Sequence, residues 1–153
     1  MGERHNIRAK EILAKIRYAT VATVTPSGKP WNSPVAYEID GNNAIYWFSD
    51  KDSQHSKNVR ANPYAFIVIY DSTAPEGTGE GVYIEADVVE LNDADEINLI
   101  RNAKKGRIVD DAHEFLGDAI RRCYRALPKR MWMNDAEEKD GKFIRDYRVE
   151  ITP

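Results

Sequence analysis

The chain has 153 residues, a length that fits one folded domain over residues 1–153. Its formal net charge is −3 with acids and bases interspersed, which argues against a protein held to nucleic acid mainly by phosphate contacts. Cys123 is the only cysteine, so neither an internal disulfide nor a zinc site built from thiolates is expected. No apolar run approaches the roughly 18 residues of a membrane span, and no signal peptide is recognisable. We therefore expect a soluble, cytoplasmic protein.

The first third of the chain predicts one helix followed by three strands. Residues 4–18 carry apolar side chains at helical spacing. The β-branched run 19–24, the segment 31–39 and the segment 44–48 read as strands separated by turns at 25–28 and 40–43. Strands that follow one another through short turns pair as a meander.

The remainder predicts a mixture of helices and strands. A short helix is expected over 53–61 with Ser53 as its N-cap, then strands over 64–70, buried on both faces, and 82–91. Helices follow over 93–105, capped by Asp93 with Ile97, Leu99 and Ile100 inward, and over 110–122. Pro128 is expected to break the chain before two final strands over 130–134 and 143–151. The sum is a mainly β (α+β) domain of six to seven antiparallel strands, closed as a barrel with flanking helices.

One polar loop carries the best candidate site. It follows the aromatic strand and offers hydroxyl, amide, imidazole and ammonium groups from Ser49, Lys51, Ser53, Gln54, His55 and Lys57. A phosphate monoester needs N–H donors at a helix start, hydroxyls and one or two cations, and this loop can supply them. The alternative is a solvated loop in which Ser53 only caps the helix.

The strand before the loop is aromatic. Tyr46, Trp47 and Phe48 are consecutive, so they alternate between the two faces of the strand. They can hold a flat ring, or they can be plain core. Together with the loop they indicate a phosphorylated aromatic cofactor, whereas His5, His55 and His113 are too scattered to predict a metal site.

The order and spacing of several short motifs are similar to those of a known group. The chain resembles the pyridoxamine 5′-phosphate oxidase-like superfamily, the FMN-binding split β-barrels. The matching segments are 22–24, 26–30, 32–35, 48–49, 53–59, 62–63, 130–134 and 148–151. The resemblance covers about residues 7–151.

The resemblance implies a homodimer with two FMN sites at the subunit interface. Ser49, at the end of the aromatic strand beside Phe48, would meet the FMN phosphate together with Ser53 and His55. His55 stands where many members have lysine and Gln54 where the oxidases have arginine, and Lys51 and Lys57 would restore charge. The run Asn32, Ser33, Pro34 and Val35 would lie along the ring and ribityl chain, and Trp132, from the partner subunit, would line the far side of the ring.

The same resemblance shows two departures. Ser33 and Glu38 stand where the true oxidase has an arginine and a lysine for the phosphate. The C-terminal segment lacks the Arg-Leu-His element that grips pyridoxine phosphate, so oxidation of vitamin B6 is not expected.

We therefore expect an FMN-dependent oxidoreductase or reductase of a small molecule, reduced by a donor such as a nicotinamide. The alternatives are a non-enzymatic flavin-binding or electron-carrier protein, and variants that bind deazaflavin or haem. A barrel that stacks single-stranded nucleic acid on its aromatics is a third class, against which the mixed charge argues.

Overall fold

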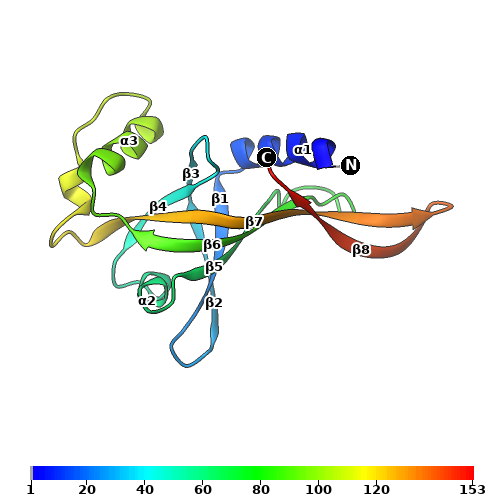
Figure 1. The fold of residues 1–153 in the computed structure, drawn as a ribbon, viewed down its shortest axis with the longest axis horizontal. Helices are drawn as coiled ribbons and strands as arrows, with labels where there is room; N and C mark the ends of the chain where they lie inside the picture. Colours follow the sequence, from blue (N-terminus) through cyan, green and yellow to red (C-terminus); the bar gives the residue numbers. More distant parts are fainter. Residues whose placement is uncertain (1) are drawn as a thin grey trace.

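The computed structural model describes residues 2–153, and Met1 lies outside the described part. These residues form one antiparallel sheet of eight strands with the path β2-β1-β5-β6-β7-β4-β3, to which β8 is added at β7 (Figure 1). The strands are β1 (Tyr18–Val24), β2 (Pro30–Ala36), β3 (Glu38–Ile39), β4 (Ile45–Asp50), β5 (Tyr64–Tyr70), β6 (Gly81–Glu90), β7 (Arg121–Lys139) and β8 (Lys142–Ile151). The predicted mainly β, split-barrel class is confirmed. The eighth strand arises because the segment predicted over 31–39 divides into β2 and β3.

The sheet closes because its two ends are neighbours in sequence. Only Tyr37 separates β2 from β3, the two ends of the strand path, so the sheet must curl until they meet. β2 then contacts β4 without a ladder between them, which leaves the barrel split at this seam. The Tyr37 hydroxyl donates a hydrogen bond to the Leu13 carbonyl (2.7 Å) and so ties the seam to the first helix.

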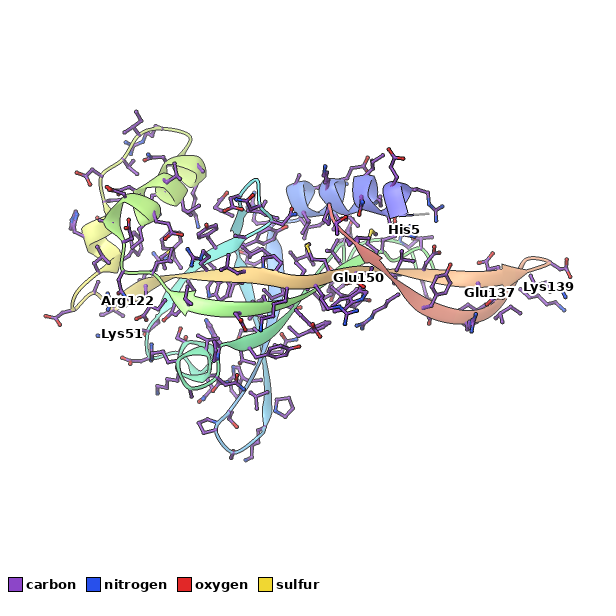
Figure 2. All side chains as sticks on the ribbon, in the orientation of Figure 1. His5, Lys51, Arg122, Glu137, Lys139 and Glu150 are labelled. Atoms are coloured by element: carbon purple, nitrogen blue, oxygen red, sulfur yellow. The ribbon has the colours of Figure 1, made fainter. Side chains whose placement is uncertain are left out.

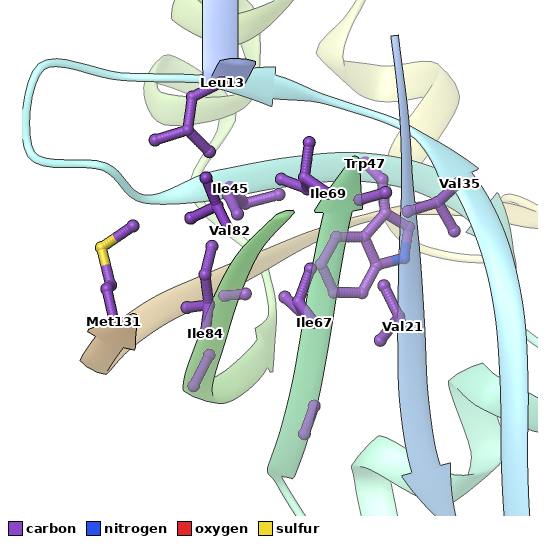
Figure 3. Close-up of a cluster of buried hydrophobic side chains, with 14 of the residues drawn as sticks. Leu13, Val21, Val35, Ile45, Trp47, Ile67, Ile69, Val82, Ile84 and Met131 are labelled. Atoms are coloured by element: carbon purple, nitrogen blue, oxygen red, sulfur yellow. The ribbon is translucent and has the colours of Figure 1, made fainter. Parts of the chain in front are cut away.

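The interior of the barrel is filled by branched aliphatic and aromatic side chains. Figure 3 shows the cluster, which includes Leu13, Val21, Val35, Ile45, Trp47, Ile67, Ile69, Val82, Ile84 and Met131. Trp47 stacks on Tyr124 with the ring centroids 5.9 Å apart. Both rings are essentially inaccessible to solvent, so these two aromatics of β4 and β7 serve the core.

Three α-helices cover the barrel. α1 (Gly2–Lys15) packs on β5, β6 and β8, and α2 (Gln54–Ala61) on β1, β2 and β6. α3 (Ala94–Lys105), capped by Asp93 as predicted, contacts the short 3₁₀ helix η1 (Ala112–Phe115) and covers the other face of β4 and β7. Within residues 2–153, none of the helices has the length and apolar character needed to cross a membrane.

The helix predicted over 110–122 is wrong. Only η1 is helical there, and β7 already begins at Arg121. Gly117 adopts a positive φ of 59°, a left-handed conformation that interrupts helical propagation. The Ile120 carbonyl then accepts from the Lys51 amide at 2.8 Å, so the chain enters the sheet instead.

Three smaller predictions also fail. Leu99 is exposed rather than inward on α3, and β5 alternates between buried and more exposed positions rather than being buried on both faces. Pro128 does not end a strand, because it lies inside β7 at the point where the register with β6 shifts after Glu85. A bulge of this kind accommodates a residue that has no N–H to donate.

The last two strands continue beyond the barrel as a projecting arm, defined here as residues 135–147 (Figure 1). Asp140 and Gly141 both have positive φ (53° and 70°), as a two-residue type I′ hairpin turn requires. The base of the arm is tied to α1 by His5, whose Nε2 lies 2.9 Å from the Asp135 carboxylate.

Candidate functional site

The predicted phosphate loop lies where β4 passes into α2. Ser49 is half-buried at the end of β4, and Ser53 precedes the first turn of the helix. The Ser53 Oγ lies 2.8 Å from the Asp50 carbonyl, 2.8 Å from the Ser56 Oγ and 3.3 Å from the His55 Nε2. The structure therefore brings Ser53 and His55 together in one small polar cluster, to which Ser56 belongs as well.

Ser53 occupies the N-cap position but does not cap with its side chain. In the described residues its hydroxyl turns back to β4 instead of accepting from the helix. The first turn, Gln54 to Ser56, contains no acid. The first turn therefore presents its N–H groups and the positive end of the helix dipole without a carboxylate among its own residues, an arrangement that suits an anion; Asp50 and Asp52 precede it in the loop.

His55 is half-buried, and this burial lowers the pKa of its imidazole below the usual range. Near neutral pH the ring is therefore uncharged in the protein alone. At this position it supplies hydrogen bonding rather than the permanent charge of a lysine.

The other polar residues of the loop have different surroundings. Gln54 donates from Nε2 to the Asn58 Oδ1 at 2.8 Å, and the buried Asn58 donates in turn to the Thr23 Oγ1 of β1 at 2.9 Å. Gln54 is therefore engaged in holding α2 on the sheet. Lys57 is exposed, whereas Lys51 is half-buried and its carbonyl accepts from Arg60.

The four predicted residues of β2 do not share one face. Ser33 and Val35 pair with Val21 and Ala19 of β1 on the core side, and Val35 is buried in the barrel interior. Asn32 and Pro34 pair with Ala22 and Thr20 on the outer side. Only Asn32 and Pro34 can therefore meet a ligand on the outer face of the sheet.

Phe48 lies on the opposite side of β4 from Ser49. Its ring packs against Phe115 with the centroids 4.6 Å apart, beneath α3. The cationic groups of Arg101 and Lys104 each lie 5.5 Å from its centroid. The structure therefore does not bring Phe48 together with the phosphate loop.

Trp132 lies on the outer face of β7. Its ring stacks on Phe66 of β5 at a centroid distance of 6.3 Å, and the guanidinium of Arg130 lies 4.7 Å from its centroid. Phe66 is also near Tyr83 of β6, over which Arg148 lies at 4.1 Å. We call this surface the outer aromatic face and define it by Tyr18, Tyr64, Phe66, Tyr70, Tyr83 and Trp132.

A cavity of about 590 Å³ lies elsewhere. It is bounded by the start of α1, the loop 77–80 and the arm, and His5, Asp135 and Phe143 are among its lining residues. None of the predicted cofactor residues lines it. Two smaller hollows, about 280 and 390 Å³, share Tyr83 and Asn134 on the outer face.

The sequence model of the pyridoxamine 5′-phosphate oxidase family matches residues 6–136 of the chain. The chain belongs to the pyridoxamine 5′-phosphate oxidase family. No curated protein matches the chain.

Solved structures at low sequence identity show the same fold. A haem-binding protein from Mycobacterium smegmatis has 22% identity and a TM-score of 0.68 over 93% of this chain, which spans 56% of that protein. A haem storage protein from Vibrio cholerae has 16% identity and a TM-score of 0.67, covering 82% of this chain and 91% of its own. An F420 reductase has 19% identity and a TM-score of 0.58, covering 80% and 94%.

Arg122 is a candidate site residue that the sequence did not reveal. It lies directly opposite Ser49 in the β4–β7 ladder, and Figure 2 shows Arg122 and Lys51 at the same end of the sheet, away from the arm that carries Glu137 and Lys139. No sequence signal pointed to it, because residues 110–122 were predicted as a helix. The observed strand register alone places Arg122 beside the loop that resembles the phosphate loop of the oxidase family.

Proposed function

We propose that the protein is a cytoplasmic FMN-binding flavoprotein of the pyridoxamine 5′-phosphate oxidase family that acts as an oxidoreductase on a small molecule. The observation that carries the proposal is the junction of β4 and α2. There, Ser53, His55 and Ser56 gather at a helix whose first turn contains no acid, and Ser49 ends the preceding strand. Family membership over residues 6–136 supports the same reading.

The residues at this junction fit a phosphate. The hydroxyls of Ser53 and Ser56 and the imidazole of His55 can donate to phosphate oxygens, and the first N–H groups of α2 point the helix dipole at the same place. A dianion beside His55 would favour its protonated form and so offset part of the effect of burial. Ser49 and Arg122 extend the polar surface onto the sheet.

We place the ring site between two copies of the chain. Asn32 and Pro34 on β2 and Trp132 on β7 share the outer side of the sheet, with β1, β5 and β6 between them along the strand path. At about 4.8 Å per strand, these three strands separate the two sets across the outer surface by more than the width of one flat ring. Pairing two outer aromatic faces in a homodimer would bring Trp132 of the partner toward β2, with the ring between.

The chain's contribution would be to bind, orient and shield the cofactor. FMN, when bound, supplies hydride and electron transfer. The cluster at α2 would anchor the phosphate, and the outer side of β2 would position the ring. Restricted access to solvent on the outer aromatic face would then decide which small molecules and which donor, such as a nicotinamide, reach the ring.

Cofactor titration tests the proposal. The purified protein should bind FMN and quench its fluorescence, and the Ser53→Ala/His55→Ala double variant should bind FMN at least tenfold more weakly, since a hydrogen bond to a charged group contributes about 1.5–3 kcal/mol. A Lys10→Ala variant, which changes an exposed lysine of α1 outside the predicted site, is the control. Full FMN affinity in the double variant would mean that the phosphate lies elsewhere.

Two further measurements separate the alternatives. Because similar structures include two haem proteins and an F420 reductase, the absorbance and mass of the copurified cofactor must distinguish FMN from haem and deazaflavin. Steady oxidation of a reduced nicotinamide by the FMN-loaded protein would support an enzyme. Its absence with every donor tried, together with a ring closed to small molecules, would favour an electron carrier.

A further inference from the structure

The position of Arg122 relative to the phosphate loop is fixed by backbone pairing. Ser49 and Arg122 are directly opposed in the antiparallel β4–β7 ladder, so their side chains share a face with Cβ atoms about 4.5–5.5 Å apart. Trp47 and Tyr124, two residues further along the same strands, stack on that face. The Lys51–Ile120 backbone hydrogen bond (2.8 Å) extends the pairing to the loop itself.

The guanidinium of Arg122 is mostly buried, but it is only weakly paired with a carboxylate. Its side chain is only 14% exposed, and its nearest carboxylate, Glu90 Oε1, is 4.0 Å from Nε. Nε itself is buried without a hydrogen-bond partner among residues 2–153, and Nη1 donates to the Phe115 carbonyl at 3.2 Å. By contrast, Arg101 is held by Asp111 at 2.7 Å.

Glu90 is shared among several groups. The same Oε1 atom accepts from the Tyr124 hydroxyl at 3.1 Å and lies 3.4 Å from the Arg60 Nη1. One carboxylate thus faces two guanidinium groups and neutralises neither of them fully. A partly buried cation in this state is costly unless another anion approaches it.

Arg122 also supplies positive charge that the cluster at the start of α2 otherwise lacks. The cluster of Ser53, His55 and Ser56 contains no permanently charged cation, because burial lowers the pKa of the His55 imidazole. We infer that Arg122 is the residue that makes the protein select a phosphorylated flavin over an unphosphorylated one, with Glu90 as its counter-ion when the phosphate is absent. The inference rests on the proposed flavin function and names the residue on which phosphate recognition depends.

Comparing the affinities for FMN and riboflavin isolates the contribution of the phosphate to binding. Dissociation constants for both are measured by flavin fluorescence for the wild type, Arg122→Met, Arg122→Lys and Glu90→Gln, each checked for folding by its thermal transition. We expect Arg122→Met to weaken FMN binding roughly 10- to 100-fold and to leave riboflavin binding within about twofold. Arg122→Lys should lose less, because it keeps the charge without the guanidinium geometry.

Glu90→Gln gives a readout that a structural role would not produce. Removing the competing carboxylate should raise the preference for FMN over riboflavin, even if the variant is less stable. The matched control is Arg125→Met, three residues along β7, whose Nε is likewise buried and unpartnered but whose Nη1 pairs with Glu96 at 2.6 Å, beneath α3. Its ratio of FMN to riboflavin affinity should match the wild type.

The outcomes separate the two proposals. A wild type that binds neither flavin overturns the proposed function, and this inference with it. A wild type that prefers FMN, with the same preference retained in Arg122→Met, overturns the inference alone. Equal loss in Arg122→Met and Arg125→Met overturns it as well, because the effect would then be one of general charge. If Arg122→Met does not fold, an unchanged preference in both Arg122→Lys and Glu90→Gln has the same consequence.

Discussion

At the scale of single residues, the environment of His55 couples the site to pH. Burial lowers the imidazole pKa in the folded state, whereas the unfolded chain has the ordinary value of about 6.5. Between these two values the unfolded state binds more protons than the folded state. The free energy of unfolding therefore rises with pH through this window and falls as the solution is acidified from about pH 6.5 through the folded-state pKa.

A His55→Gln variant should lose the part of the pH dependence of stability that comes from this imidazole. Urea unfolding at pH 7.5, 6.5 and 5.5 should show a smaller decrease in stability on acidification than in the cofactor-free wild type. His113→Gln, which changes an exposed residue of η1, should keep the wild-type dependence. An unchanged pH dependence in His55→Gln would show that the imidazole is not desolvated as the structure indicates.

Cys123 provides a second residue-level prediction. The side chain is fully buried, and this burial, with a smaller effect from Glu96, raises the thiol pKa to about 12 from 9.0. Three units lower the thiolate fraction near pH 8 about 1,000-fold. A disulfide reagent should thus react with the native protein at least about 100-fold more slowly than with the protein in urea. Rapid reaction of the native thiol would contradict the burial of β7 beneath α3.

At the scale of elements, the placement of α2 depends on one buried amide. Asn58 is inaccessible to solvent and bridges Gln54 on its own helix to Thr23 on β1 (2.8 and 2.9 Å). A buried polar group is stabilising only while its partners remain, so the bridge fixes where the helix start lies relative to the sheet.

Breaking the bridge should destabilise the protein. Asn58→Ala is expected to lower the free energy of unfolding by about 1–3 kcal/mol, because Thr23 is left buried and unpaired. Thr23→Val should cost less than this, and the double variant should cost less than the sum of the two, as expected of residues in contact. Urea unfolding measures all three, and simple additivity would show that the two side chains do not interact.

The elements that were predicted correctly are those with a clear local pattern. The β-branched run of β1 and the capped helix α3 each carry their own signal, Asp93 at the N-cap of α3 included. The 110–122 helix failed because its apolar residues also suit a loop and a strand, and the pairing that decides its end comes from β4, distant in sequence. Leu99 was misplaced because helical spacing alone does not say which side of the helix meets the sheet.

Only those residues of the candidate site that are close together in sequence could be predicted to meet. Ser53 and His55 are close in sequence and meet in space. The structure places Phe48 and Val35 on faces away from this cluster, because the face to which a strand residue points depends on the register with its neighbours, which sequence alone did not fix. Arg122 did not enter the predicted set for the same reason, since its partner Ser49 lies on a strand far away along the chain.

At the scale of the whole molecule, the outer aromatic face presents several exposed aromatic side chains on one side of the sheet. Tyr18, Tyr64 and Tyr70 are 58%, 44% and 47% exposed, and they surround the half-buried Phe66 and Val68. Exposed aromatic groups on the outer surface of a sheet are typical of protein interfaces, where tyrosine and tryptophan are enriched. The proposed homodimer would cover this face and bring Trp132 of the partner toward β2.

A charge at the centre of this face should therefore prevent both assembly and cofactor binding. Val68 lies between Thr20 of β1 and Tyr83 of β6, so Val68→Arg places a guanidinium where the two copies would meet. Sedimentation velocity should show a dimer for the wild type and a monomer for Val68→Arg, with FMN affinity reduced at least tenfold although Arg122 and the α2 cluster are unaltered. Leu99→Arg, at an exposed apolar position on α3 that is 67% accessible, should remain dimeric and bind FMN normally. A wild type that binds one FMN per chain while sedimenting as a monomer would rule out the shared site, since the ring would then need no group from a second subunit.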